Sequence, residues 1–273
     1  MRASAHLAVA RAGAGTAVGT RITRLHSDPP LVLRPTNPAG PESLRRWNLE
    51  ELAPARVSLV AGAAGPIGGD DLHLSIEVGP GAGLILRTVA ATLVLPGPHR
   101  QPSHSEISVR VAEDGVLVWL PGPTIAARDC RHQIITRVAL EPGARLLLRE
   151  ELLLGRHGEQ PGAIRQRLRV CLGDSPLYDQ ELELGPGAAG WDGAAVTGGR
   201  RALGSLLVVD PDWHGHPFEA PPSTADAETT LMPLSGPAVL VTALANDAFT
   251  LRSRLDSGLT ALEATPTRPS PNA

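Results

Sequence analysis

The sequence contains no lysine, so arginine is its only strongly basic residue. This absence excludes hydrolysis of nucleotides by a P-loop lysine, catalysis through a lysine Schiff base, and a protein kinase of the usual plan. Aromatic residues make up only 3% of the chain, and the formal net charge is −3. Nucleic-acid-binding proteins usually carry a basic surface and aromatic stacking platforms, so we expect no nucleic-acid partner.

Cysteine and long apolar segments are equally scarce. The two cysteines, Cys130 and Cys171, do not suffice for a disulfide framework, which favours a reducing compartment. The sequence has no run of about eighteen uncharged apolar residues, so we expect no membrane span. Residues 1–21 lack a basic start followed by a long apolar core, so we expect no signal peptide. These features predict a cytoplasmic protein.

Hydrophobic periodicity indicates strands. Apolar and polar residues alternate in residues 72–78, 106–111 and 164–172, as expected for half-buried strands. Such segments run into a glycine-containing turn and then a second apolar segment, which predicts four hairpin-like units. The turn glycines lie roughly thirty residues apart, a spacing typical of stacked repeats: Gly81, Gly115, Gly143 and Gly173.

These patterns predict a mainly β fold, a stacked or helical arrangement of strands resembling a solenoid or sandwich, with about two α-helices. The helices are expected over residues 42–52 and 248–259, where apolar residues recur at near-helical spacing. Residues 145–154 suit helix or strand, and the repeat context favours strand. We expect one domain over residues 1–264. A loop is expected over 215–227 and a disordered tail over 265–273.

Several clusters carry possible chemistry. Asp70 and Asp71 follow Gly68 and Gly69 just before a strand, where two carboxylates suit either a cation or a β-turn that bonds its own backbone. Cys130 and His132 are possible ligands for nickel or zinc, although an ordinary surface turn is the alternative. His214 and His216 likewise suit a metal or a plain loop.

Glu150 and Glu151 flank an apolar run, where burial would raise the pKa of one carboxyl group and suit it to acid–base work. On a strand they point to opposite faces, so at most one faces the core. Pairing with an arginine is the structural alternative. Arg165, Arg167 and Arg169 form a stripe that fits a solvated face or an acidic protein partner.

Ordered motifs give a further indication. The chain resembles the urease accessory protein UreD (UreH) family in four segments over about residues 20–210, each with the family's glycine, proline, tryptophan or acidic positions. The segments and their main residues are Pro66 to Leu72 with Gly68 and Gly69, Gly79 to Thr92 with Thr88, Val118 to Ile125 with Trp119 and Pro121, and Glu150 to Glu159 with Gly155 and Arg156. The chain departs from relatives at Val89 and across residues 93–96, so it is a divergent member.

The resemblance implies a β-rich, non-enzymatic urease maturation factor. Such a protein binds apo-urease and UreF, recruits the UreG GTPase and passes nickel to urease, with no tightly bound cofactor. A water-filled passage is the implied route. On this basis Asp70, Asp71 and Glu150 are predicted to touch nickel in transit, and Cys130 and His132 are weaker candidates. Two other hypotheses remain: a β-rich hydrolase that uses Asp70, Glu150 or Glu151 as its acid pair, and a plain protein-interaction module.

Overall fold

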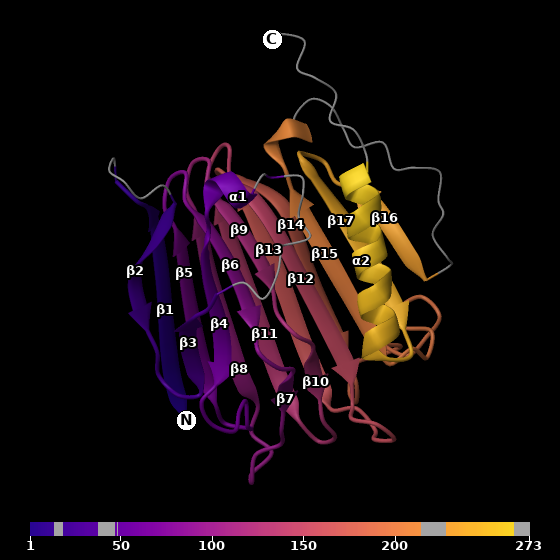
Figure 1. The fold of residues 1–273 in the computed structure, drawn as a ribbon. Helices are drawn as coiled ribbons and strands as arrows, with labels where there is room; N and C mark the ends of the chain where they lie inside the picture. Colours follow the sequence, from indigo (N-terminus) through magenta and orange to yellow (C-terminus); the bar gives the residue numbers. More distant parts are fainter. Residues whose placement is uncertain (14–18, 38–46, 48, 214–227, 265–273) are drawn as a thin grey trace.

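The computed structural model describes residues 1–13, 19–37, 47, 49–213 and 228–264 (Figure 1). Within these residues the chain forms two β-sheets that pack face to face, and helix α2 (Ala248–Ala264) lies on the outer face of the larger sheet. The mainly β, solenoid-like prediction is therefore confirmed.

The smaller sheet has seven strands within the described residues. In spatial order they are β14 (Ser175–Leu184), β13 (Ala163–Leu172), β11 (Arg131–Leu140), β8 (Ser103–Val111), β5 (Asp71–Val78), β1 (Arg2–Arg11) and β2 (Thr20–His26). Strands β13, β11, β8, β5 and β1 run parallel to one another, and an antiparallel strand completes each edge. This sheet therefore consists of stacked parallel rungs.

The larger sheet has ten strands in the same part of the chain. Eight lie in the order β16 (Thr229–Pro233), β17 (Ala238–Ala245), β15 (Ala202–Val209), β12 (Arg145–Leu154), β9 (Val116–Leu120), β6 (Gly83–Thr88), β4 (Ala55–Ala61) and β3 (Leu31–Pro35). Two short strands, β7 (Thr92–Val94) and β10 (Thr124–Ala126), extend it, and β10 pairs with β12. Strands β4, β6, β9 and β12 are parallel.

The hairpin prediction is right for one turn and wrong for three. The turn at Gly173 joins β13 and β14, which pair antiparallel. The turns at Gly81, Gly115 and Gly143 instead join a strand of the smaller sheet to a strand of the larger one. The two arms of each such turn face one another through side chains, and each pairs with the corresponding arm of the next rung. Glycine turns mark where the chain reverses, but they do not specify the pairing of the arms.

Two apolar layers hold these elements together. The main core lies between the sheets and includes Leu7, Ile76, Leu86 and Leu146, each less than 2% exposed. A second core lies between the larger sheet and α2, which contributes residues such as Leu255. The inter-sheet layer fixes the spacing of the two sheets, and so positions the site described below.

The helix predictions differ in outcome. The helix expected over residues 248–259 is confirmed as α2, and the Asp247 carboxylate caps it by accepting a hydrogen bond from Thr250 N at 2.8 Å. Over residues 42–52 only the single turn α1 (Leu49–Leu52) is helical among the described residues, and 42–46 and 48 lie outside them. Residues 145–154 form strand β12 as expected. The predicted loop over 215–227, the tail over 265–273, and His214 and His216 lie outside the described residues.

The short helix η1 (Pro211–Trp213) follows β15. No helix in the described ranges combines the length and hydropathy that crossing a membrane requires.

Candidate functional site: a cavity between the sheets

A cavity of about 480 Å³ lies between the two sheets. Its walls come from both sheets, with Leu74, Ile107 and Ile134 on one side and Trp119 and Leu148 on the other. The side chains of β12 that face it belong to the same alternating set as Leu146 in the main core. The cavity is therefore a continuation of the inter-sheet layer that side chains do not fill.

Polar side chains interrupt the apolar inner faces beside this cavity. On the smaller sheet they are Ser105, His132, Thr136 and Gln166, and on the larger sheet Glu150. Gln166 is 8% exposed, and its Oε1 has no hydrogen-bond partner among the described atoms. Buried polar groups normally find a partner, so this carbonyl is available to a ligand or water in the cavity.

Glu150 is the carboxylate that the inner face of β12 presents to the cavity, and Glu106, Arg149 and Glu151 also contribute to the lining. Burial raises its pKa from 4.5 to about 7, and a hydrogen bond from Gln166 opposes part of that shift. Desolvation in an apolar cavity disfavours the charged form of an acid. At neutral pH Glu150 therefore lies near the midpoint of its titration, where a cation readily displaces its proton.

His132 is a buried, neutral imidazole beside the same cavity. Its Nδ1 lies 2.8 Å from Ser103 Oγ, and the residue is 5% exposed. Burial lowers its pKa to about 4, so the ring is uncharged at neutral pH. Because Nδ1 is engaged by Ser103, Nε2 is the nitrogen left for a ligand. Neutral imidazole is the form that binds nickel and related metals.

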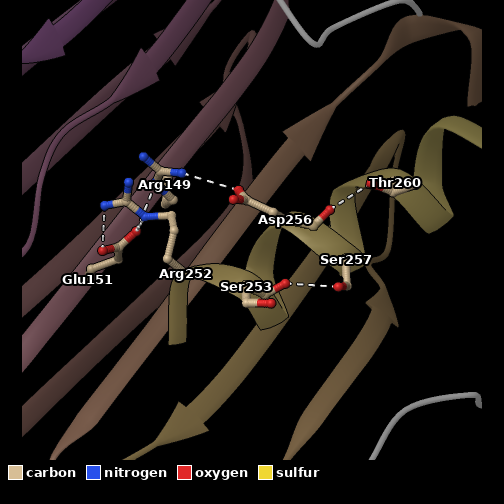
Figure 2. Close-up of polar contacts among 7 residues, drawn as sticks. All are labelled: Arg149, Glu151, Arg252, Ser253, Asp256, Ser257 and Thr260. Atoms are coloured by element: carbon tan, nitrogen blue, oxygen red, sulfur yellow. Dashed lines mark hydrogen bonds and ion pairs between the residues drawn. The ribbon is translucent and has the colours of Figure 1, made fainter. Parts of the chain in front are cut away.

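Glu151 lies on the opposite face of β12 from Glu150, as the strand assignment predicted. Its carboxylate, fully buried, pairs with two arginines: Arg252 of α2 donates from Nη2 to Oε2 at 2.8 Å, and Arg149 Nε lies 3.0 Å from Oε1 without hydrogen-bond geometry. Arg149 Nη1 reaches Asp256 of α2 at 3.4 Å. Figure 2 shows these four side chains between the strand and the helix. Both glutamates contribute to the cavity lining, but the Glu151 carboxylate is held by two arginines, so the two do not present a pair of free carboxylates to one cleft.

The two aspartates before β5 hold the chain locally. Asp70 is 5% exposed; its Oδ1 lies 2.9 Å from the Met1 amino nitrogen, and its Oδ2 accepts a hydrogen bond from Ile67 N at 2.8 Å. Asp71 pairs with Arg2 at 3.2 Å and with His73 at 3.0 Å on the outer face. Neither aspartate is among the residues that line the cavity. The contact of Asp70 with Ile67 N matches the turn alternative, whereas Asp71 pairs with side chains. A role in nickel transit stays a prediction for both.

Cys130 is packed in a satellite core rather than in the cavity lining. The residue is 1% exposed, and burial, followed by the charges of Glu159 and Asp129, raises the pKa of its thiol to about 11. Since the thiolate is the metal-binding form, a thiol that stays protonated at neutral pH is a poor ligand. Within the described ranges, no group of three or more His, Cys, Asp or Glu side chains is arranged to hold a metal.

The motif residues have structural reasons for their identities. A Cβ on Gly68 would lie 2.4 Å from Gly97 N, and a Cβ on Gly155 would lie 2.6 Å from Glu159 O. Gly69 and Gly155 both have positive φ, at 95° and 82°. Arg156 forms a bidentate pair with Glu159, and the hydrogen bonds from Arg156 lower the pKa of Glu159 to about 2. These motifs shape the turns at the ends of the rungs.

The arginine stripe on β13 pairs within the protein. Arg165 contacts Glu181 at 2.6 Å, and Arg167 forms a bidentate contact with Asp179 on the neighbouring strand β14. Both arginines remain half exposed, so the pairs are surface ladders of opposite charge. The stripe therefore forms a solvated face whose charge is largely balanced.

Sequence reasoning missed the polar members of the smaller sheet that face the cavity. Gln166 and Thr136 stand at alternate positions on faces that are otherwise apolar, such as Ile164, Leu168 and Val170 on β13. A polar residue in the apolar register of a strand is the signal that identifies them. This sequence pattern identifies the residues, but it does not show which sheet their side chains face.

Comparison with known proteins places the chain in a family. The UreD urease accessory protein family matches residues 1–272. Urease accessory protein UreD of Streptomyces avermitilis is 42% identical over 263 residues, covering 96% of this chain and 98% of the relative. UreD of Frankia casuarinae is 42% identical, covering 94% and 88%, and UreD 3 of Streptomyces griseus is 46% identical, covering 81% and 86%. The chain belongs to the UreD family of urease accessory proteins.

Proposed function

We propose that this protein is a non-enzymatic urease maturation factor that binds apo-urease and UreF, recruits the UreG GTPase and conveys nickel to the urease active site. Family membership supports the maturation role. The observation that supports the conveyance is the inter-sheet cavity, whose lining includes a carboxylate, an imidazole and an amide carbonyl among mainly apolar side chains.

The chemistry of the cavity suits transit. Nickel accepts oxygen and nitrogen ligands, and a conduit must release the ion as readily as it binds it. Glu150 supplies one negative charge, and its pKa of about 7 means that binding of the cation exchanges with a proton. His132 supplies a neutral nitrogen, and Gln166 supplies the free carbonyl. Such a set holds a divalent ion weakly.

The division of labour follows from the sequence. The chain has no lysine for a P-loop, so hydrolysis of GTP belongs to a partner. The proposed protein supplies the scaffold and the passage, and it acts in the cytoplasm with its partners. Asp70, Asp71 and Cys130 remain predicted contacts of nickel rather than members of the proposed cavity set.

The test is co-expression with apo-urease and the other accessory proteins, followed by purification of urease and measurement of its nickel content and activity. We expect omission of this chain to abolish nickel loading. Glu150→Ala is expected to lower loading several-fold while the accessory complex still co-purifies. The control is Glu113→Ala, an exposed carboxylate in the turn between β8 and β9.

Two outcomes would contradict parts of the proposal. Full urease activation without this chain would contradict the maturation role. Normal loading by Glu150→Ala together with His132→Ala, in an intact complex, would leave the protein as an interaction module that does not convey the ion.

A further inference from the structure

The larger sheet is interrupted beside the cavity. Strand β12 pairs with β9 only through residues 145–148 and with β10 only through 152–154, so residues 149–151 have no strand partner on that side. Two neighbouring strands are interrupted at the same level. Residues 89–91 separate β6 from β7, and residues 121–123 separate β9 from β10. These three segments surround what we call the break.

Specific residues produce the break in the sheet. Pro121 and Pro123 have no N–H to donate to a ladder, which ends β9. Thr88 then joins two sides of the break: its Oγ1 accepts a hydrogen bond from Gly122 N at 2.7 Å and donates to Ala90 O at 2.9 Å. Two of the family-motif positions, Thr88 and Pro121, therefore shape it.

The cavity meets solvent at the break. Residues 89–91 are exposed, with Val89 68% exposed, and the same three residues line the cavity. Pro121, Gly122 and Glu150 line it as well. The exposed loop and the half-buried carboxylate thus belong to one continuous hollow, so the cavity reaches the outside through the face of a sheet.

The third side of the break is held from outside by α2. Arg149 and Glu151 lie in the part of β12 that pairs with β15 but has no strand partner on the side of β9 and β10. Their side chains pair with Asp256 and Arg252 of the helix (Figure 2). The helix itself is packed closely on the sheet, since Leu255 lies 3.0 Å from the Cβ position of Gly204 on β15. The helix therefore anchors the strand where ladder hydrogen bonds are missing on one side.

We propose that the break is the mouth of the cavity, a lateral opening through the larger sheet by which ions and water exchange, and that Arg252 braces its β12 edge by holding Glu151. The inference rests on the proposed function only for the identity of the cargo. The opening and the brace are properties of the isolated chain, so they are tested without urease.

The first experiment measures access to the cavity. In a background of Cys130→Ala and Cys171→Ser, Glu150→Cys supplies a single thiol inside the cavity, and neutral iodoacetamide is the probe. We expect this thiol to react under native conditions. Adding Ala90→Trp, which places a large side chain at the mouth, is expected to slow alkylation at least tenfold. Ala189→Trp, at an exposed site outside the cavity lining, is the matched control and should leave the rate unchanged.

An unchanged rate in the Ala90→Trp protein, with an unchanged thermal unfolding midpoint, would overturn the lateral mouth and leave the ends of the sandwich as the route. Reaction of the introduced thiol only as fast as global unfolding would overturn it too. These results do not depend on whether the protein matures urease, so failure here is distinct from failure of the proposed function.

The second experiment tests the brace by amide hydrogen exchange. We expect Arg252→Met to accelerate exchange in residues 149–151 at least tenfold relative to the rest of β12. Arg165→Met removes a surface pair on the other sheet and is the control. Equal exchange in these residues for the Arg252→Met protein and the unsubstituted protein would overturn the bracing role.

Discussion

Arg252 and Glu151 meet across 101 residues of sequence, with Arg252 Nη2 donating to Glu151 Oε2 at 2.8 Å. The carboxylate is fully buried, while the guanidinium is about one-third exposed. A buried charge is stable only when it is paired, so the position of α2 and the burial of the Glu151 carboxylate depend on each other. The ion pair therefore couples the C-terminal helix to the strand that carries Glu150.

Replacing Arg252 with Met is expected to destabilise the protein by about 2–4 kcal/mol, because it leaves the buried Glu151 carboxylate with Arg149 as its main partner. Urea unfolding monitored by circular dichroism measures the change. The double variant Glu151→Gln with Arg252→Met removes the incompletely paired carboxylate, while Arg149 keeps Asp256 as a partner, and should recover part of the loss. A double variant less stable than the single one would contradict this account.

Because of Glu150, we expect the folding stability of the protein to fall as the pH rises. The pKa of Glu150 is about 7 in the folded protein against 4.5 as the ordinary value, so between these values the folded state binds more protons. Glu150→Gln should therefore be more stable than the unsubstituted protein by about 1–3 kcal/mol above pH 7, and equal to it below pH 4.5. Urea midpoints at about pH 5 and pH 8 measure the difference. Glu113→Gln is the exposed control, and a constant offset at both pH values would contradict the prediction.

For His132 we expect the opposite pH dependence, a folding stability that falls as the pH falls. Burial lowers its pKa from 6.5 to about 4, so between these values the unfolded chain binds a proton that the folded protein does not. The stabilisation from neutral His132 is present above pH 6.5 and is lost as the pH falls towards 4. His132→Gln should lose less stability than the unsubstituted protein between about pH 7 and pH 4.5. Thermal melts across this range, with exposed His104→Gln as control, test it; parallel pH profiles for both variants would contradict it.

At Gly68 we expect a side chain to destabilise the protein for steric reasons, independently of charge. A Cβ there would lie 2.4 Å from Gly97 N and 2.5 Å from Gln101 O, both backbone atoms with little room to move. Gly68→Ala is therefore expected to destabilise the protein by about 1–3 kcal/mol. Gly13→Ala, where nothing lies within 4 Å, is the control. Equal thermal midpoints for the two variants would show that the turn around Gly68 adapts without cost.

Much of the fold follows from residue periodicity. The alternation in 72–78 and 164–172 predicts β5 and β13, and the turn glycines predict where the chain reverses. Pairing was not predictable from these signals, since each arm of the turn at Gly115 has an apolar face and suits either a hairpin or two facing sheets. The chain adopts facing sheets because each arm then pairs with equivalent arms of adjacent rungs.

The site was predictable in part. Strand periodicity places Glu150 and Glu151 on opposite faces, but it does not say which one meets the cavity, because both faces of β12 are buried. The partner of Glu151 lies 101 residues away on a helix, and the partner of Glu150 lies on the other sheet. Such contacts arise from the packing of whole elements, which local spacing does not encode.

The two sheets face each other through side chains, and the cavity is a place where those side chains fall short. The width of the cavity is therefore determined by side chains such as Trp119 and Leu148 rather than by the backbone hydrogen bonds of the sheets. Single substitutions at these positions are expected to widen or narrow the cavity while the strands keep their pairing. The volume of the cavity is thus set separately from the architecture of the two sheets.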